Sequence, residues 1–335
     1  MWGAVFVFLK LLMAQPDFPP VGVIIPNFNG VHLLRRNLPS VIRAAAAYPG
    51  TCSIIVVDDG SVDGSAEMLR TEFPSVRVVV HEANRGFAEA IHSGVDAADA
   101  EFLIFLNSDV RPQEDFMAPL IRHLEKPEVF SVSPLVLDED GRVSPVSWRC
   151  FRIKRGRLRS VRWRFDDLKS AAPTESLFAS GGSVALRKSM FVALGGYLPL
   201  YKPFYSEDFD LGLRAWKRGW RTLLEPASRV VHEKKGSISE NVAADRVRKT
   251  RVCNRFLLEW THMPGKDLML YLLPGYLFQL IGRLLRLDLV YVRGFFAALR
   301  RLPEALRVRA EIRKHQVLDF WRIVDAVERS FGLKA

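Results

Sequence analysis

The sequence predicts an α/β fold in which a mostly parallel, Rossmann-like sheet is flanked by helices. Short apolar runs of strand length recur in the first third of the chain, and amphipathic stretches of helical length separate them. This alternation is typical of βαβ units, in which each helix returns the chain to the start of the next parallel strand. Long apolar stretches after residue 266 predict a helical region at the C-terminal end.

The predicted elements alternate along the chain. Each predicted strand is rich in Val, Ile, Leu or Phe, as expected for strands that are buried on both faces. These runs occupy residues 21–25, 53–57, 76–80 and 102–106. The stretches that follow them have the length and polarity of crossover helices, at residues 31–47, 65–73, 86–97 and 113–124.

The composition is that of a globular protein with an anionic partner. A chain of 335 residues with 49% hydrophobic and 25% charged residues can bury a sizeable core, which excludes a disordered protein. Its three cysteines are widely spaced and odd in number, so neither a disulfide framework nor a zinc site is indicated, and a reducing compartment is the simplest inference. The net charge of +11 and the pI of about 9.8 favour a membrane surface, a nucleic acid or a phosphorylated substrate.

Polar residues follow the ends of the first three predicted strands. The carboxyl ends of parallel strands meet at one edge of the sheet, where α/β proteins bind their ligands. A carboxylate such as Asp59 can accept from the imide N–H of a pyrimidine, and Phe28 can pack on the face of the base. Asp63 is instead expected to cap a helix. The predicted nucleotide site contains Pro26, Asn27, Phe28, Asn29, Asp58, Asp59, Ser61, Asn84, Arg85 and Gly86.

Asn107, Ser108 and Asp109 directly follow the fourth predicted strand. A carboxylate at this edge of the sheet is well placed to hold a divalent cation against a diphosphate. The alternative is that Asp109 caps the next helix or turn, to which Asp is also suited.

The chain resembles the family 2 glycosyltransferases, inverting enzymes of the GT-A fold, in the order and spacing of several motifs. These are VIIPNFNG, VVDDGSVDGS, NRGFAEA, LNSDV, FASGGSVALRKSMFVALGGY, FYSEDFDLGLRAWKRGW and VVH, and they look most like the branch that includes rhamnosyltransferase-like enzymes. The resemblance implies that Asp59, with Phe28 and Arg85, holds the nucleotide base. It also implies that Asp109 is the metal-binding member of the family's DxD motif and that His232 is a further ligand, with Mn²⁺ or Mg²⁺ as cofactor.

The DxD motif departs from the family pattern in this chain. Its first Asp is Asn107 here, and its middle residue is Ser108, so both are placed beside the donor nucleotide and metal binding rests on Asp109. An amide oxygen can ligate a hard cation but carries no charge, and weaker metal affinity is therefore expected. Taken without the family, His232 would be an ordinary histidine.

The implied reaction needs a base that takes the proton of the attacking acceptor hydroxyl. We assign this role to Asp208, which recurs at helical spacing with Leu211 and Ala215. Glu207 is expected to orient the base or to bind acceptor hydroxyls, and Asp210 to have a structural or salt-bridging role. The alternative for the pair is a helix N-terminal charge that the dipole favours.

Two glycines and one aromatic residue are candidates for contact with sugars. Gly181 and Gly182 would let the backbone approach the donor or acceptor closely, and Trp220 would offer an aromatic wall to a sugar ring. Ordinary turn chemistry and packing in the core are the respective alternatives.

Three segments are expected. An N-terminal apolar segment covers residues 1–20. Its apolar run, residues 2–13, is shorter than the roughly 20 residues that span a bilayer, and it lacks the basic start of a secretory signal. The GT-A domain covers residues 21–250, with a nucleotide-binding half at 21–110 and an acceptor half at 111–250. Residues 251–335 form a helical extension that associates with the membrane surface.

The C-terminal region and a basic segment both favour a membrane surface. Residues 149–165 interleave Arg and Lys with aromatic residues outside any recognised nucleic-acid-binding fold, so an anionic bilayer or a lipid diphosphate is preferred to nucleic acid. Residues 267–302 mix apolar runs with arginines, which suits interfacial helices better than a transmembrane span. A helical packing domain or a dimer interface is the alternative, and a homo-oligomer through these helices remains open.

The sequence thus predicts a metal-dependent glycosyltransferase that is cytoplasmic and peripherally associated with the inner face of the membrane. Its partners are a nucleotide-diphosphate sugar and a glycan or lipid-linked acceptor. Two alternatives remain open: a catalytically silent nucleotide-sugar-binding scaffold, and a phosphotransfer enzyme that uses Asp58 and Asp59, although the DxDx pattern of aspartyl nucleophiles is absent.

Overall fold

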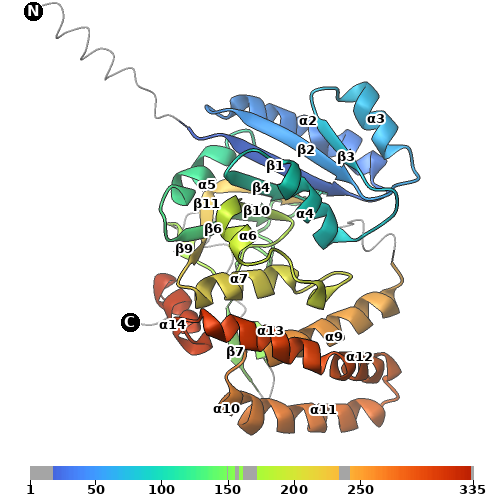
Figure 1. Ribbon diagram of the computed structural model, residues 1–335, viewed down its shortest axis with the longest axis vertical. Coiled ribbons are helices and arrows are strands. Elements are labelled where there is room, and N and C mark those ends of the chain that lie inside the picture. Colours follow the sequence, from blue (N-terminus) through green and yellow to red (C-terminus); the bar gives the residue numbers. More distant parts are fainter. Residues whose placement is uncertain (1–17, 149, 155–157, 161–171, 234–241, 333–335) are drawn as a thin grey trace, which may run out of the picture.

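The computed structural model of the chain describes residues 18–148, 150–154, 158–160, 172–233 and 242–332. The N-terminal apolar segment up to residue 17 and most of the basic segment at residues 149–165 lie outside the described residues. The described part has a sheet with helices on its faces and a layer of C-terminal helices (Figure 1).

A nine-stranded sheet forms the centre of the α/β part. Its strands are β1 (Val21–Asn27), β2 (Cys52–Asp58), β3 (Arg77–Val80), β4 (Phe102–Leu106), β5 (Val110–Pro112), β6 (Val129–Leu137), β9 (Thr174–Glu175), β10 (Ser183–Arg187) and β11 (Arg221–His232). Their order is β3-β2-β1-β4-β10-β6-β11-β5, with β9 beside β11. The strands β1, β2, β3, β4, β6 and β11 run in one direction, and β5, β9 and β10 run in the other. The predicted mostly parallel sheet is confirmed.

The predicted crossover helices are also present. They are α2 (Val31–Ala47), α3 (Ser65–Glu72), α4 (Phe87–Ala97) and α5 (Met117–Leu124), and α2 has the predicted bounds. The last helix begins later than the predicted residue 113 because β5 and a turn, in which the Phe116 N–H donates to the Gln113 carbonyl, occupy the chain first. The segment after Gly182 is β10 followed by the short helix α6 (Lys188–Ala193).

Side chains of the central strands alternate between two cores, one on each face of the sheet. Val23 and Ile25 of β1 pack with α2 and α5, whereas Ile24 between them packs with α4 and α6. Gly94 of α4 lies against β1: a Cβ there would come within 2.3 Å of Ile24 Cγ2. The helices therefore fix the sheet from both faces, which leaves the carboxyl edge of its parallel strands for a site.

The acceptor half contributes α7 (Glu207–Lys217), which packs against a layer of C-terminal helices (Figure 1). These are α9 (Ala244–His262), α10 (Gly265–Asp267), the π-helical turn η3 (Leu268–Leu272), α11 (Leu273–Leu284), α12 (Leu289–Arg300), α13 (Leu302–Lys314) and α14 (Phe320–Ser330). One apolar cluster joins Trp216 of α7, Phe256 of α9 and Phe320 of α14. Helix α9 runs through residue 250, where the sequence had placed a domain boundary.

None of the helices in the described ranges is both long and apolar enough to cross a bilayer. The predicted helical C-terminal region is confirmed as helical.

Candidate functional site

The first part of the site lies where β1 and β2 end side by side. Asn27, the last residue of β1, is in register with Asp58, the last residue of β2. The Asp58 carboxylate accepts from Asn27 Nδ2 at 2.8 Å and from Ser61 Oγ at 2.5 Å. Ser61 Oγ accepts from the Asn29 N–H at 2.9 Å, and Asn29 Oδ1 accepts from the Val62 N–H at 2.9 Å. These predicted nucleotide residues therefore bind one another and fix the shape of two loops.

Asp59 links the second of these loops to the third. Its carboxylate accepts from the backbone N–H groups of Arg85 at 2.9 Å and Gly86 at 2.8 Å. His81 Nδ1 lies 2.6 Å from the same carboxylate, and His81 Nε2 lies 2.9 Å from Ser93 Oγ. Asp59 is only 3% exposed. His81 was missed in the sequence, where a lone histidine after a strand carries little signal.

The loops after β2 and β3 approach each other very closely at Gly60. This residue has φ +73°, and a Cβ on it would lie 2.5 Å from the carbonyl carbon of Ala83. Both the backbone conformation and the lack of space therefore require glycine here. The neighbouring Asn84 is exposed, as is the side chain of Arg85, which lies 3.9 Å from Glu89. The rim of this pair of loops is thus open to a ligand.

Two further residues flank the first loop. Phe28 is half-buried after β1, and Pro26 is paired with Val57 within the sheet. Asp63 accepts from the Val31 N–H at 2.8 Å and from the Ser65 N–H at 3.1 Å. The predicted helix-capping role of Asp63 is confirmed.

The second part of the site brings Asp109 and His232 together. β5 begins directly after Asp109 and pairs antiparallel with the end of β11, so that Val110 lies opposite His232. As a result, Asp109 Oδ1 lies 3.6 Å from His232 Nε2. The Asp109 side chain is 7% exposed and that of His232 is 40% exposed, so the pair opens to solvent on the histidine side.

Glu233 and Asn37 brace this pair from behind. The Glu233 N–H donates to the Asp109 carbonyl at 3.1 Å. Asn37 Nδ2 donates to the Ser108 carbonyl at 3.0 Å and to Glu233 Oε1 at 3.1 Å. Both bracing residues are buried. The sequence analysis missed them; the available signals were a carboxylate beside the predicted ligand and an amide on the buried face of α2.

The donor atoms fit a divalent cation. A carboxylate oxygen and an imidazole nitrogen 3.6 Å apart can both bind one Mn²⁺ or Mg²⁺ through bonds of about 2.1 Å. Asn107 Oδ1, two residues from Asp109, is buried without a hydrogen-bond partner among the described residues. No group of three or more His, Cys, Asp or Glu side chains suited to a metal occurs within those residues, so water and donor phosphates would complete the shell, as is common for Mg²⁺.

The third part of the site is the carboxylate pair in the first turn of α7. The Gly181 N–H donates to Asp208 Oδ2 at 3.3 Å, and a Cβ on Gly181 would lie 3.4 Å from Asp208 Cβ. The Asn107 N–H donates to the Gly182 carbonyl at 2.9 Å, and a Cβ on Gly182 would lie 2.9 Å from Asn107 Nδ2. The two glycines therefore connect the loop after β4 to the start of α7, and their small size permits this contact.

Glu207 has the strongest electrostatic perturbation in this part of the site. Burial, and then the neighbouring Asp208, raise the pKa of Glu207 to about 8. Its Oε2 is buried without a hydrogen-bond partner in the described part of the chain. Glu207 therefore holds its proton more tightly than an exposed glutamate does, although it lies near the positive end of the α7 dipole.

The turn before the pair is strained and is held by a residue from α9. Tyr205 and Ser206 have φ +73° and +78°, in the left-handed region that non-glycine residues rarely adopt. Asn254 Nδ2 lies within hydrogen-bonding distance of the carbonyls of Tyr201 (2.7 Å), Phe204 (3.0 Å) and Tyr205 (2.9 Å). Asn254 is 1% exposed. This amide, which the sequence analysis also missed, positions the start of α7.

Asp210 anchors α7 from its buried side. It accepts from Arg214 Nε at 2.6 Å and from Tyr201 Oη at 3.1 Å, and lies 2.8 Å from His262 Nε2. Arg214 also donates to the carbonyls of Leu194 and Gly196. The predicted structural and salt-bridging role of Asp210 is confirmed.

The structure does not bring Trp220 to this site. Trp220 precedes β11, whose first residue, Arg221, pairs with Val129 at the start of β6. It therefore lies at the amino ends of the parallel strands, at the opposite edge of the sheet. Its ring stacks on Phe130 with centroids 6.5 Å apart, and the Arg218 guanidinium lies 5.6 Å from its centroid. The prediction of a sugar-binding wall is wrong because the turn after α7 returns the chain to the far edge before β11 begins.

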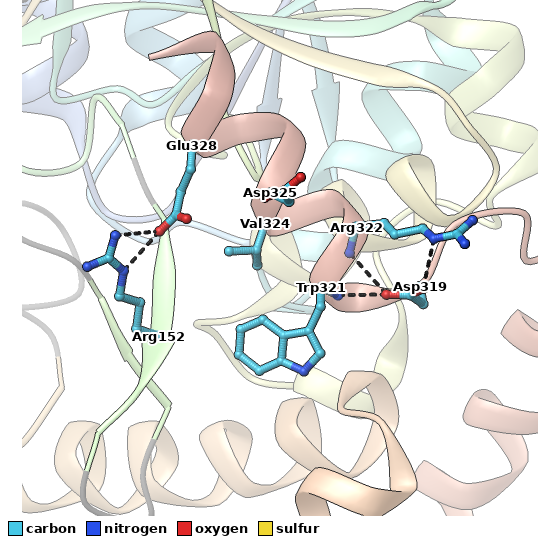
Figure 2. A pocket seen from close by; sticks show the side chains of 7 residues that line it. All are labelled: Arg152, Asp319, Trp321, Arg322, Val324, Asp325 and Glu328. Carbon is cyan, nitrogen blue, oxygen red and sulfur yellow. Dashed lines mark hydrogen bonds and ion pairs between the residues drawn. The ribbon is translucent and has the colours of Figure 1, made fainter. Parts of the chain in front are cut away.

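A hollow of about 600 Å³ beside α14 is not part of the site (Figure 2). Arg152 of β7 (Phe151–Ile153) pairs across it with Glu328 at 2.8 Å, and Arg322 lies 3.5 Å from Asp319. None of the predicted site residues lines this hollow. Its charges are matched against one another, which gives a charged ligand little to bind.

Comparisons with known proteins agree with this geometry. Residues 22–195 match the family model for Glycosyl transferase family 2. The N-acetylglucosaminyl-diphospho-decaprenol L-rhamnosyltransferase of Mycobacterium tuberculosis (strain H37Rv) is 28% identical over 215 residues, which cover 57% of this chain and 70% of the relative. Mouse polypeptide N-acetylgalactosaminyltransferase 16 is 28% identical over 234 residues, which cover 66% of this chain and 41% of the relative.

Solved structures share the fold at lower identity. GalNAc-T7 with UDP, GalNAc and Mn²⁺ has a TM-score of 0.57 at 20% identity, over 75% of this chain and 49% of that chain. A mannosyltransferase from Pyrobaculum calidifontis in complex with GDP-Man and Mn²⁺ has a TM-score of 0.51 at 17% identity, over 99% of this chain and 96% of that chain. The fold is therefore of the GT-A type. Since the family model covers more than half of its length, the chain belongs to glycosyl transferase family 2.

Proposed function

We propose that this protein is an inverting, metal-dependent glycosyltransferase that transfers a sugar from a nucleotide-diphosphate donor to a hydroxyl of a lipid-linked or cell-envelope glycan. The observation that carries the proposal is the run of contacts between the two chemical parts of the site. Asp109 lies against His232 at one end, and the Gly181–Gly182 backbone joins the loop of Asp109 to Asp208 at the other. A cation site and a base thus flank the same short backbone segment.

Donor binding is assigned to the loops after β1, β2 and β3. Their shape is fixed by the hydrogen bonds of Asp58 and Asp59, and their rim offers the half-buried ring of Phe28 and the exposed guanidinium of Arg85. Asp109 and His232 would hold Mn²⁺ or Mg²⁺, which when bound supplies Lewis-acid stabilisation to a departing diphosphate. Both GT-A neighbours described above contain Mn²⁺ beside a nucleotide or a nucleotide sugar, which supports this assignment.

Asp208 is the proposed general base. Its carboxylate takes the proton of the acceptor hydroxyl as that oxygen forms a bond to the anomeric carbon. The bond from the anomeric carbon to the diphosphate oxygen breaks on the opposite face, and its electron pair leaves with the nucleoside diphosphate. One displacement of this kind inverts the anomeric centre and needs no covalent nucleophile. The raised pKa of Glu207 supports the assignment, because a protonated Glu207 adds no second negative charge beside the base and can donate to an acceptor hydroxyl.

The acceptor class is inferred from the M. tuberculosis relative, whose name specifies transfer to a diphospho-decaprenol-linked sugar. A lipid-linked acceptor also accords with the basic charge of the chain and with its apolar C-terminal helices. We place the enzyme at the cytoplasmic face of the membrane, as a peripheral protein, because nucleotide sugars are the proposed donors.

The first test is thermal stabilisation by UDP, dTDP and GDP, with and without Mn²⁺, in the wild type and in Asp109→Asn. A ligand at 100 times its dissociation constant should add about 2.7 kcal/mol to the free energy of unfolding. We expect a metal-dependent increase with one nucleotide that the variant loses. If no diphosphate stabilises the protein, the donor site is misassigned and the phosphotransfer alternative returns. If donor binds but Asp208→Asn leaves sugar transfer unchanged, the catalytic role of Asp208 is refuted, and a protein that binds donor without any transfer is the silent scaffold.

A further inference from the structure

The outward side of α11 is an uninterrupted apolar surface. Phe278 is 82% exposed and Leu277 is 62% exposed, and their neighbours on the same side are also exposed. Their spacing places them on one side of the helix, opposite the buried Leu272, Tyr276 and Gln279. We call this surface the α11 face; it consists of Leu270, Leu273, Leu277, Phe278, Ile281, Leu284 and Leu285.

The polarity of α11 is the reverse of that of a water-exposed surface helix. Tyr276 Oη points inward and donates to Glu259 Oε2 at 2.6 Å. Gln279 Oε1 also points inward and accepts from Tyr291 Oη at 3.1 Å. A helix on the surface of a soluble protein normally buries its apolar stripe and exposes its polar groups. Here the hydrogen-bonding groups are in the protein and the leucines are outside, so the α11 face requires an apolar partner.

The length and flanking charges of this segment define the partner. Residues 268–282 carry no charged side chain, but this stretch is shorter than the roughly 20 residues that cross a bilayer. Exposed basic residues stand at both of its ends, Lys266 before η3 and Arg286 in the turn after α11, whereas Arg283 is paired with Asp288 at 2.8 Å. Residues 265–301 contain six Lys or Arg against two Asp. Such a helix suits the boundary between the headgroups and the acyl chains of an anionic bilayer.

A second copy of the chain fits the α11 face less well. Two-fold symmetry would place the same patch on both partners and so bring the exposed Arg286 and Arg293 of each copy toward like charges. Anionic lipid headgroups would instead pair with these guanidinium groups while the leucines and Phe278 enter the apolar region. The charges therefore favour lipid over self-association.

We infer that the protein docks on an anionic lipid bilayer through the α11 face, with α11 lying in the plane of the interface. Figure 1 shows α11 at the end of the molecule farthest from β1–β3, with α9, α12 and α13 between it and α7. The strands β1–β3 would therefore lie farther from the bilayer than the C-terminal helices do. The inference deepens the proposed function, on which it rests for its purpose, because it names the surface that would bring the enzyme to a lipid-linked acceptor.

The test is co-sedimentation of the full chain with phosphatidylcholine vesicles that contain or lack phosphatidylglycerol. The key variant is Leu277→Asp combined with Phe278→Glu; both side chains are exposed, so the fold should be kept, which the melting temperature checks. The matched control is Val192→Glu, an exposed apolar residue of α6 at 58% exposure. Since neither donor nor acceptor is present, the assay is independent of the nucleotide-stabilisation test of the proposed function.

We expect the wild type and Val192→Glu to sediment with the anionic vesicles and to bind the neutral vesicles more weakly. The partition coefficient of the double variant for anionic vesicles should be about tenfold lower, or more, than that of the wild type. Arg286→Glu should weaken binding to anionic vesicles and leave binding to neutral vesicles unchanged. A wild type that stays in the supernatant with anionic vesicles, or a double variant that binds as well as wild type, overturns the inference. A double variant that converts a dimer to a monomer in light scattering, with vesicle binding unchanged, shows instead that the α11 face is a contact between copies.

Discussion

The two ends of the site use their buried polar atoms differently. At the ends of β1 and β2, the carboxylates of Asp58 and Asp59 accept hydrogen bonds from the loops around them and so stabilise the conformation of these loops. Near β4 and α7, Asn107 Oδ1 and Glu207 Oε2 are buried without hydrogen-bond partners among the described residues. Asn27 Oδ1 at the first end is likewise buried without a partner among those residues, but the two carboxylates there are satisfied, whereas Glu207 Oε2 at the second end is not. Since unsatisfied buried oxygens are costly, the second end leaves a carboxyl oxygen for the proposed ligand to satisfy. Substitutions at the first end should therefore cost stability, and those at the second should cost turnover.

The largest effect is expected for Asp109→Asn. Loss of the carboxylate beside His232 removes the charged oxygen of the proposed cation site, so metal-dependent sugar transfer should be abolished while the fold is kept. Transfer rates with and without Mn²⁺, measured beside the exposed control Asp115→Asn, provide the check. Unchanged activity in Asp109→Asn would refute the assignment.

Asp208→Asn should reduce the transfer rate by about 10² to 10⁴-fold, the usual contribution of a general base. Stabilisation by the nucleotide should remain, because Asp208 contacts the Gly181 N–H rather than the nucleotide loops. Single-turnover rates and nucleotide melting shifts separate the two effects. A rate loss of less than tenfold would argue against this residue as the base.

Asp59→Asn tests the other end of the comparison. The amide cannot accept from Arg85, Gly86 and His81 as the carboxylate does, so the free energy of unfolding should fall by about 1–3 kcal/mol even without ligand. Urea unfolding measures this change. If turnover is lost while the unfolding midpoint stays at the wild-type value, Asp59 acts on the ligand and does not stabilise the fold. The proposed difference between the two ends would then be wrong.

Glu207→Gln should change the pH dependence of stability. The folded protein holds the Glu207 proton up to about pH 8, whereas the unfolded chain releases it near 4.5. The wild type therefore loses stability as pH rises between these values, and the glutamine variant, which has no proton to lose, should not. Unfolding curves across this range should show that the free energy of unfolding of the variant rises relative to that of the wild type as the pH rises. An equal pH dependence of stability in the two proteins would contradict the raised pKa.

Local signals in the sequence were sufficient to place several strand ends of the sheet. The apolar runs of β1, β2 and β4 are followed immediately by Asn27, Asp58 and Asn107, so each strand and its polar turn can be found without knowledge of the rest of the chain. Of the two backbone contacts of Asp63, the one to the Ser65 N–H is equally local, whereas the one to the Val31 N–H joins distant segments. The strand ends were predicted correctly wherever a strand and its polar turn were neighbours in the sequence.

The residues that were missed or misplaced depend on pairings between distant segments. Glu233 reaches the loop of Asp109 only because β11 ends beside β5, and Asn254 reaches the turn before α7 only because α9 packs behind it. Trp220 was misplaced because its edge of the sheet is set by the register of β11 with β6. Composition and periodicity carry no information about such registers.

The pairing of β5 with β11 also imposes an order on the assembly of the protein. During synthesis the chain from β1 to β4 emerges first and can close its loops, but the partner of Asp109 arrives only with the last strand of the sheet. The proposed cation site is thus a contact between segments far apart in the sequence, and such contacts pay a large loop-closure cost during folding. A cation or donor that binds there is recognised only by the completed sheet, and it stabilises the finished enzyme without stabilising a partly folded chain.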